Sequence, residues 1–201
     1  MTDESLREHP VQGAEVFRGN FLRVRRDTVQ LPDGTRTERE YVLHPGAVVI
    51  IPVLGEAGDA AGCRVILERQ YRYPMRQVIV EFPAGKLDPG EQALACAQRE
   101  LREETGYRAA EWARAGQMHP LVAYSDEAID IWLARGLEAG PRQLDHGEFL
   151  QVIETSCAQL MAWCRNGTVT DAKTLIGAFW LQQWFGGQWQ PQWQPAGAQA
   201  P

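Results

Sequence analysis

Residues 85–107, with the sequence GKLDPGEQALACAQRELREETGY, constrain the fold more than any other stretch of this 201-residue chain. The turn sequence DPG at 88–90 predicts that a helix begins directly after it. The run 92–105 is rich in residues that favour helices, and Gly106 fits a left-handed C-terminal cap. Glu91 is expected in the first helical turn, where a carboxylate complements the helix dipole. The stretch therefore predicts a loop, a helix and a second loop.

The predicted helix has two contrasting faces. An apolar face should pack on a core and consists of Leu94, Ala97 and Leu101. An acidic face carries three glutamates at spacing i, i+3, i+4, namely Glu100, Glu103 and Glu104. Like charges at this spacing destabilise a helix by roughly 0.2–0.5 kcal/mol per pair. Arg99 can pair with Glu103, and a bound divalent cation would relieve the remaining repulsion. The alternative is a solvated charged face with no ligand.

The whole pattern resembles the Nudix hydrolase signature. The matching positions are Gly85, Glu91 and the run RELREETGY at 99–107. The resemblance implies an α/β/α sandwich with a mixed β-sheet between helices, and hydrolysis of a nucleoside diphosphate linked to another group. It also implies Mg²⁺ or Mn²⁺ held by the carboxylates of Glu100, Glu103 and Glu104 together with the backbone carbonyl of Ala84. Arg99 is expected to orient these acids rather than to act as a catalyst.

Composition limits the other classes of function. The formal net charge of −6 and the pI of about 5.3 favour neither nucleic acid nor an anionic membrane as partner. No apolar run reaches the length of a membrane span, and the N-terminal MTDESLREHP lacks a signal-peptide core. The four cysteines form no CxxC pair. We therefore expect four reduced thiols in a cytoplasmic protein.

The order of sequence patterns suggests four segments. Residues 1–15 are expected to be flexible, and residues 16–45 to form a small antiparallel β segment with a turn at 32–34. Residues 46–185 should form the Nudix domain, and the low-complexity tail 186–201 should be disordered. The N-terminal sheet is too small to be stable alone. The family resemblance implies that it exchanges across a homodimer.

Within residues 46–185 the pattern predicts strands and helices around the signature. The continuous apolar run 47–54 suits a strand that is buried on both faces. Further strands are predicted at 64–70, 77–82, 107–116, 128–134 and 149–154, with a loop at 119–127. Ser156 and Asp171 are expected to cap the N-termini of two helices, one at 157–165 and one that follows Asp171.

Segments outside the signature resemble the ADP-ribose pyrophosphatase branch of the family. They are EYVLHPG at 40–46, RQYR at 69–72, EFPAGKLD at 81–88, YSDE at 124–127 and TDAKT at 170–174. For ADP-ribose the products would be AMP and ribose 5-phosphate. The sequence HPL at 119–121 departs from the Ser-Pro-Gly that this branch often carries, so GDP-mannose and other nucleotide sugars remain open.

Residues that could bind the substrate are fewer and less specific. Arg72 ends a strand and could hold a phosphate with two parallel hydrogen bonds, or form a surface ion pair. Arg39 is a weaker candidate for the same role. Glu81 could accept a hydrogen bond from a sugar or base, or orient the signature loop. An aromatic clamp for a purine could come from the N-terminal segment, where the available side chains are Phe17, Phe21 and Tyr41.

The general base is the least constrained part of the site. In the ADP-ribose branch a glutamate on a loop beyond the signature often takes this role. Glu148, in the polar loop LDHGEF at 144–149, fits by position, and Glu127 is the alternative. A signature acid such as Glu103 is a third possibility. A non-catalytic module that binds a nucleotide sugar is the competing function, although such proteins usually lose a signature acid and this chain retains all of them.

Overall fold

The protein is described by a computed structural model, which covers residues 3–55, 62–144 and 146–197. The chain forms two compact units. The first comprises Met1–Gly46 and His119–Ala128, and the second comprises Ala47–Met118 and Ile129–Pro201. No helix among the described residues is long and apolar enough to cross a membrane.

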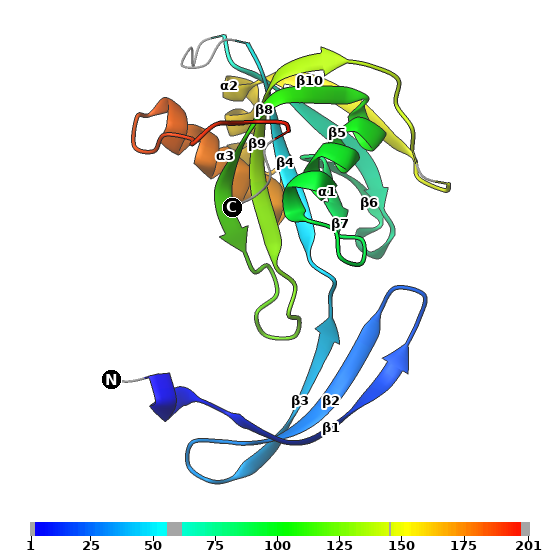
Figure 1. The fold of residues 1–201 in the computed structure, drawn as a ribbon, viewed down its shortest axis with the longest axis vertical. Coiled ribbons are helices and arrows are strands. Elements are labelled where there is room, and N and C mark those ends of the chain that lie inside the picture. Colours follow the sequence, from blue (N-terminus) through cyan, green and yellow to red (C-terminus); the bar gives the residue numbers. More distant parts are fainter. Residues whose placement is uncertain (1–2, 56–61, 145, 198–201) are drawn as a thin grey trace. The chain divides into compact units, whose positions relative to one another are not determined.

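The first unit is an antiparallel sheet of three strands in the order β1, β2, β3 (Figure 1). The strands span His9–Arg18, Arg23–Gln30 and Arg36–Leu43. The predicted turn at 32–34 joins the last two, with the Leu31 amide donating to the Thr35 carbonyl at 2.8 Å. The expectation that residues 1–15 are loose is wrong for the described part of this segment, because a short helical turn spans Asp3–Leu6 and β1 begins at His9. Residues 1 and 2 lie outside the described residues. Pairing with β2 supplies backbone hydrogen bonds that need no apolar side chains.

The loop at 119–128 belongs to this first unit although it lies far along the sequence. The Val42 amide donates to the Tyr124 carbonyl at 2.9 Å, and the Asp126 amide donates to the Val42 carbonyl at 3.3 Å. The Asp126 carboxylate accepts from the His44 amide at 2.7 Å. The predicted loop is therefore confirmed, and it extends the edge of β3 beside Val42.

A mixed sheet forms the centre of the second unit. Its strands follow the order β10, β5, β4, β9, β8, β11, with β6 paired to β5 and β7 paired to β4. β4 and β9 are parallel and the other pairs are antiparallel. The bounds are Ala47–Leu54 (β4), Arg64–Arg72 (β5), Gln77–Glu81 (β6), Ala84–Lys86 (β7), Tyr107–Met118 (β8), Ile129–Ala139 (β9), Leu150–Ser156 (β10) and Gln194–Pro195 (β11).

Helices cover both faces of this sheet (Figure 1). The helix α1 (Ala93–Glu100) packs its predicted apolar face against Val48 and Ile50 of β4. On the opposite face, α2 (Cys157–Asn166) and α3 (Ala172–Phe185) pack against Val49 and Ile51. The sandwich is confirmed, as is the burial of β4 on both sides. Ser156 and Asp171 cap α2 and α3 as expected, each accepting from a backbone amide three residues on.

A disulfide joins Cys63 to Cys157, so the expectation of four reduced thiols is wrong for this pair. The residues are 94 positions apart, with Cα atoms 5.5 Å apart. The antiparallel pairing of β5 and β10 explains their meeting, because the start of β5 lies opposite the end of β10 and the Cys157 amide donates to the Cys63 carbonyl at 2.9 Å. Cys96 and Cys164 are free.

The segment after Gly186 is also more ordered than expected. Trp189 and Trp193 pack against the core that α3 covers, and Arg135 lies over the Trp193 ring at 4.1 Å. Gln194–Pro195 then pairs with β8, and the Gln98 side chain donates to the Ala196 carbonyl at 2.8 Å. The tail therefore docks through its aromatic side chains, at least as far as residue 197. The expected disorder of 198–201 lies outside the described residues.

Candidate active site

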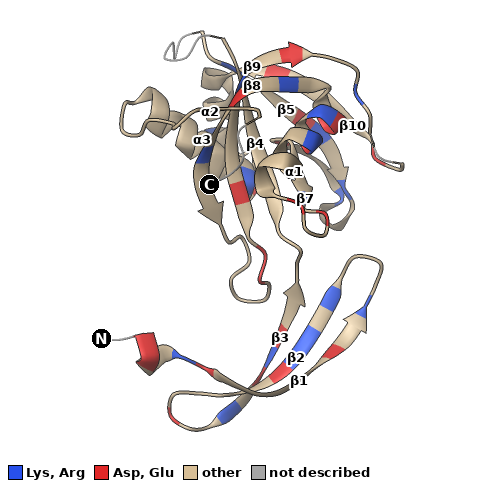
Figure 2. Cartoon of the chain, viewed as in Figure 1, with Lys and Arg blue, Asp and Glu red and all other residues tan. Residues whose placement is uncertain are grey.

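The glutamates of the signature are presented where α1 ends. After Glu100 the chain continues in a π-helical turn, Leu101–Thr105, and the predicted cap Gly106 stops it with φ of 79°. Gly85 allows this packing, because a Cβ atom at this position would lie 1.9 Å from the Glu100 carboxylate. A side chain at this position on β7 would therefore displace the Glu100 carboxylate. Figure 2 shows acidic and basic residues interleaved at this end of the helix.

Arg99 holds several of these acids together. Its guanidinium donates to Glu100 at 2.7 Å, to Glu103 at 3.1 Å and to Glu91 at 2.8 and 2.9 Å. These bonds keep the pKa of Arg99 above its ordinary value and lower the pKa of Glu91 to about 2. Glu91 lies before the helix, not in its first turn as expected, because Arg99 and the Asp88 amide bind its carboxylate there. The orienting role expected for Arg99 matches these contacts.

Two further carboxyl groups are almost fully buried. Glu104 is 4% exposed and accepts a hydrogen bond from the Ala84 amide at 3.1 Å. Glu68 on β5 is 2% exposed, and its Oε1 atom has no hydrogen-bond partner within the described residues. Burial raises the pKa of both groups, that of Glu68 to about 8. The charges of Glu81 and Glu148 raise the pKa of Glu68 further, and the charge of Glu68 is among those that raise the pKa of Glu104. Glu68 was not predicted from the sequence, although its place directly after the apolar run VIL at 65–67 is a usable signal.

Arg72, Lys173 and Asp171 form an ionic network around the buried Glu81. Arg72 donates to both oxygens of Glu81, at 2.7 and 2.9 Å, and Lys173 donates to Glu81 and to Asp171. Glu81 is 2% exposed. The Thr174 hydroxyl, at the start of α3, accepts a hydrogen bond from the Phe82 amide, directly after β6, at 2.9 Å. Both oxygens of Glu81 are thus engaged in orienting the segment that leads into the signature, and Arg72 keeps a half-exposed side chain.

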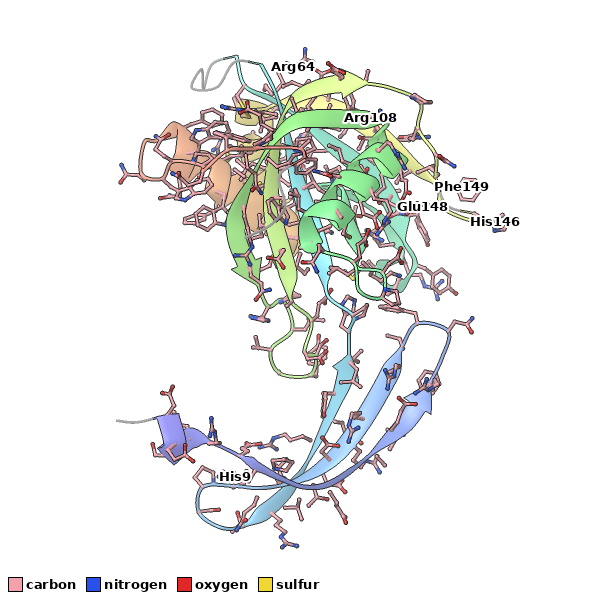
Figure 3. All side chains as sticks on the ribbon, viewed as in Figure 1. His9, Arg64, Arg108, His146, Glu148 and Phe149 are labelled. Atoms are coloured by element: carbon pink, nitrogen blue, oxygen red, sulfur yellow. A yellow bond between two sulfur atoms is a disulfide. The ribbon has the colours of Figure 1, made fainter. Side chains whose placement is uncertain are left out.

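Glu148 lies on the segment that leads into β10, next to the exposed Phe149 (Figure 3). Its side chain is half-buried. Its negative charge contributes to the raised pKa of Glu68, Glu100 and Glu104, which places it within electrostatic reach of all three. Asp145, in the same predicted loop, lies outside the described residues. The structure therefore brings Glu148 toward the signature acids, and its role as base stays a prediction.

Other predicted site residues belong to the first unit. Arg39 on β3 donates to Glu8 at 2.6 and 3.0 Å. Glu127 lies in the 119–128 loop, 3.6 Å from the His44 ring. Among the three aromatic candidates, the Tyr41 hydroxyl donates to Asp27 at 2.7 Å and the Phe21 ring packs edge-on to that of His44, whereas Phe17 is half-exposed. The roles of these residues toward a substrate stay predictions.

The donor set fits a hard divalent cation in its chemistry. The residues are oxygen donors, carboxylates outnumber the cationic side chains around them, and a buried carboxylate oxygen of Glu68 has no partner within the described residues. As the side chains stand, no three His, Cys, Asp or Glu side chains in the described ranges gather closely enough to hold a metal ion. Arg99 binds both Glu100 and Glu103 in this arrangement.

Comparison with known proteins places this geometry in a family. Residues 43–175 match the NUDIX domain, and residues 8–42 match the nucleoside diphosphate sugar hydrolase N-terminal domain. An ADP-ribose pyrophosphatase of Bacillus subtilis is 34% identical over 89% of this chain and 95% of its own length. A methanol dehydrogenase activator of Bacillus methanolicus is 35% identical over 87% of this chain and 92% of its own.

Among solved structures, a crystal structure of an ADP compounds hydrolase has the same fold, with a TM-score of 0.78 at 24% identity. The match covers 90% of this chain and 95% of that one. The family match spans more than half of the chain and includes the acids that the end of α1 presents. The chain belongs to the Nudix hydrolase family, and its N-terminal sheet is of the kind found in nucleoside diphosphate sugar hydrolases.

Proposed function

We propose that this protein hydrolyses the diphosphate bond of ADP-ribose, with AMP and ribose 5-phosphate as products. The observation that carries the proposal is the cluster of Glu100, Glu103 and Glu104 at the end of α1, with every signature acid present. The 34% identity to an ADP-ribose pyrophosphatase over most of both chains supports the choice of substrate. The intact acid set argues against a module that only binds the nucleotide.

We propose that Mg²⁺ or Mn²⁺ is held by Glu100, Glu103 and Glu104 with the Ala84 carbonyl. When bound, it supplies positive charge that neutralises the diphosphate. The contacts of Ala84 support its part in this set, because its amide already donates to Glu104. Arg99 keeps Glu100 and Glu103 oriented on one side of the site.

The remaining chemistry falls to residues around this cluster. Water attacks one phosphorus of the diphosphate, the bond to the bridging oxygen breaks, and the phosphate ester on the other side leaves. Glu148 takes the proton of the attacking water, and Glu127 is the alternative. Arg72, fixed by Glu81, offers the outer edge of its guanidinium to a phosphate oxygen.

The experiment is a panel of nucleoside diphosphate sugars assayed for hydrolysis with Mg²⁺, with Mn²⁺ and after chelation. ADP-ribose should be preferred, and GDP-mannose is the main competitor because His119-Pro120-Leu121 differs from the usual loop. Glu104→Gln should lower turnover by about two to three orders of magnitude. A wild-type protein that binds ADP-ribose but cleaves no member of the panel would make it a binding module. Full activity after exhaustive chelation would refute the metal requirement.

We also propose a homodimer in which the N-terminal sheet contacts the other subunit. The sheet exposes several large apolar side chains, among them Val16, Phe17, Phe21 and Leu22, which a partner could cover. Light scattering at micromolar concentration should give twice the mass of the 22.6 kDa chain. A monomeric mass, or full activity after deletion of residues 1–43, would refute this arrangement.

A further inference from the structure

The buried Glu68 is a carboxyl group that the proposed chemistry does not use. It lies on β5 in direct register with Glu81 on β6, so two acids face each other across neighbouring strands. Both are 2% exposed. A buried polar atom without a hydrogen-bond partner destabilises the folded state, and more so when it is charged. An acid at such a position needs a physical reason.

The neighbouring acid does not share this problem. Glu81 receives hydrogen bonds from Arg72 and Lys173 on its two oxygens. Those two cations act on Glu68 only through space, and its Oε1 atom has no partner among residues 3–55, 62–144 and 146–197. Glu68 is therefore a buried acid that receives no hydrogen bond from a cation among the described residues.

The position of Glu68 relates it to the signature. Its strand partner Glu81 lies three residues before Ala84, whose amide donates to Glu104, the most buried of the three signature acids. The negative charges of Glu68 and Glu148 also raise the pKa of Glu104. A divalent cation taken up beside Glu104 would supply the charge that is missing.

We propose that Glu68 is an additional carboxylate of the cation site, which contributes its free oxygen to a divalent ion held by the signature acids. The inference rests on the proposed metal-dependent function. It adds a metal-binding residue from β5, a strand that lies outside the signature. A direct or water-mediated contact would both satisfy the free oxygen.

The test is a titration of the full-length protein with Mn²⁺ in the absence of any substrate, by calorimetry and by the electron paramagnetic resonance signal of free Mn²⁺. Glu68→Gln keeps the shape and removes the charge. It should weaken Mn²⁺ binding by about 10–100-fold, the range for residues that support a metal site. Glu104→Gln should weaken binding in the same way. Glu154→Gln is the matched control, since it removes a partly exposed acid from β10 that pairs with Arg64.

Thermal unfolding separates this role from a structural one. Without metal, Glu68→Gln and Glu68→Leu should unfold at the same temperature as the wild type or higher, because an unsatisfied acid is lost. With saturating Mn²⁺, the wild type should gain more in unfolding temperature than either variant. Unchanged Mn²⁺ affinity in Glu68→Gln would overturn the inference. So would variants that unfold several degrees lower without metal but show the full gain with Mn²⁺.

The two proposals fail in different ways. If the wild type hydrolyses ADP-ribose and Glu68→Gln binds Mn²⁺ normally, the role of Glu68 is refuted and the function stands. If no nucleoside diphosphate sugar is cleaved but Mn²⁺ binding depends on Glu68, the proposed function is refuted and the cation site stands.

Discussion

Replacing Lys173 with methionine tests whether the network around Glu81 holds the second unit together. The Lys173 ammonium donates to Glu81 and Asp171, and its side chain is only 13% exposed. Methionine keeps an unbranched apolar side chain of similar length while it removes the charge. The substitution should therefore isolate the ionic contacts between the start of α3 and the end of β6.

The expected loss of stability depends on the hydrogen bonds that Glu81 and Asp171 retain in the variant. Glu81 retains two hydrogen bonds from Arg72, and Asp171 retains those from the Thr174 amide and hydroxyl at 2.9 and 2.6 Å. Removing one partner of a buried ion pair costs about 3–5 kcal/mol. Because Arg72 still compensates Glu81, we expect a loss near the lower limit, about 3 kcal/mol.

The assay is equilibrium urea unfolding of metal-free protein at pH 7. Glu81→Gln in the Lys173→Met background should recover part of the loss, with a coupling of about 1–3 kcal/mol in the double-mutant cycle. Arg165→Met removes an exposed cation from the end of α2 and should stay within about 0.5 kcal/mol of the wild type. A loss below about 1 kcal/mol for Lys173→Met with no coupling to Glu81 would show that the network is not structural, against the reasoning here.

Three further predictions follow from the site and the core. Glu148→Gln should lower turnover on ADP-ribose by roughly 10²–10⁴ at saturating Mg²⁺ with little change in substrate affinity; an effect under threefold, with a large effect of Glu127→Gln, would move the base to the loop at 119–128. Because burial raises the pKa of Glu68 from 4.5 to about 8, the folded state retains a proton that the unfolded state loses, and metal-free stability should fall as pH rises across that range. Urea unfolding should show a shallower fall in Glu68→Gln, and an equal slope would contradict the assignment. Cys157→Ser should lower the stability of the oxidised protein by about 2–4 kcal/mol, and a reductant should lower the wild type alike; no difference between oxidised and reduced wild type would count against the bond to Cys63.

Helices, buried strands and helix caps could be predicted from the sequence because they depend on residues that are close together along the chain. The helix that carries Glu100, Glu103 and Glu104 follows from residue preferences, a turn before it and a glycine after it. The burial of β4 on both faces follows from its unbroken apolar run, and the caps at Ser156 and Asp171 follow from their side-chain oxygens. The first part of β1, residues 9–15, was missed because its residues give no alternating pattern, and its order comes from pairing with β2.

Contacts between distant segments were decided by the tertiary structure. The composition of the tail after Gly186 suggested disorder, but a surface beside α3 and β8 accepts its tryptophans. Cysteine spacing gave no sign of the bond between Cys63 and Cys157, because only the register of β5 against β10 brings them together. In both cases the free energy comes from a surface that exists only after the sheet has formed.

In the candidate site, too, the local features were predictable from the sequence and the contacts between distant segments were not. The sequence by itself determined that Glu100, Glu103 and Glu104 lie where α1 ends, because the residue preferences that form and stop the helix are local. Only the tertiary structure decided that Glu81 is held by Arg72 and Lys173 while Glu68, in register with it, keeps an unsatisfied oxygen among the described residues. The electrostatic state of a carboxylate depends on burial and on charges from other strands, and neither is encoded in its neighbours along the chain.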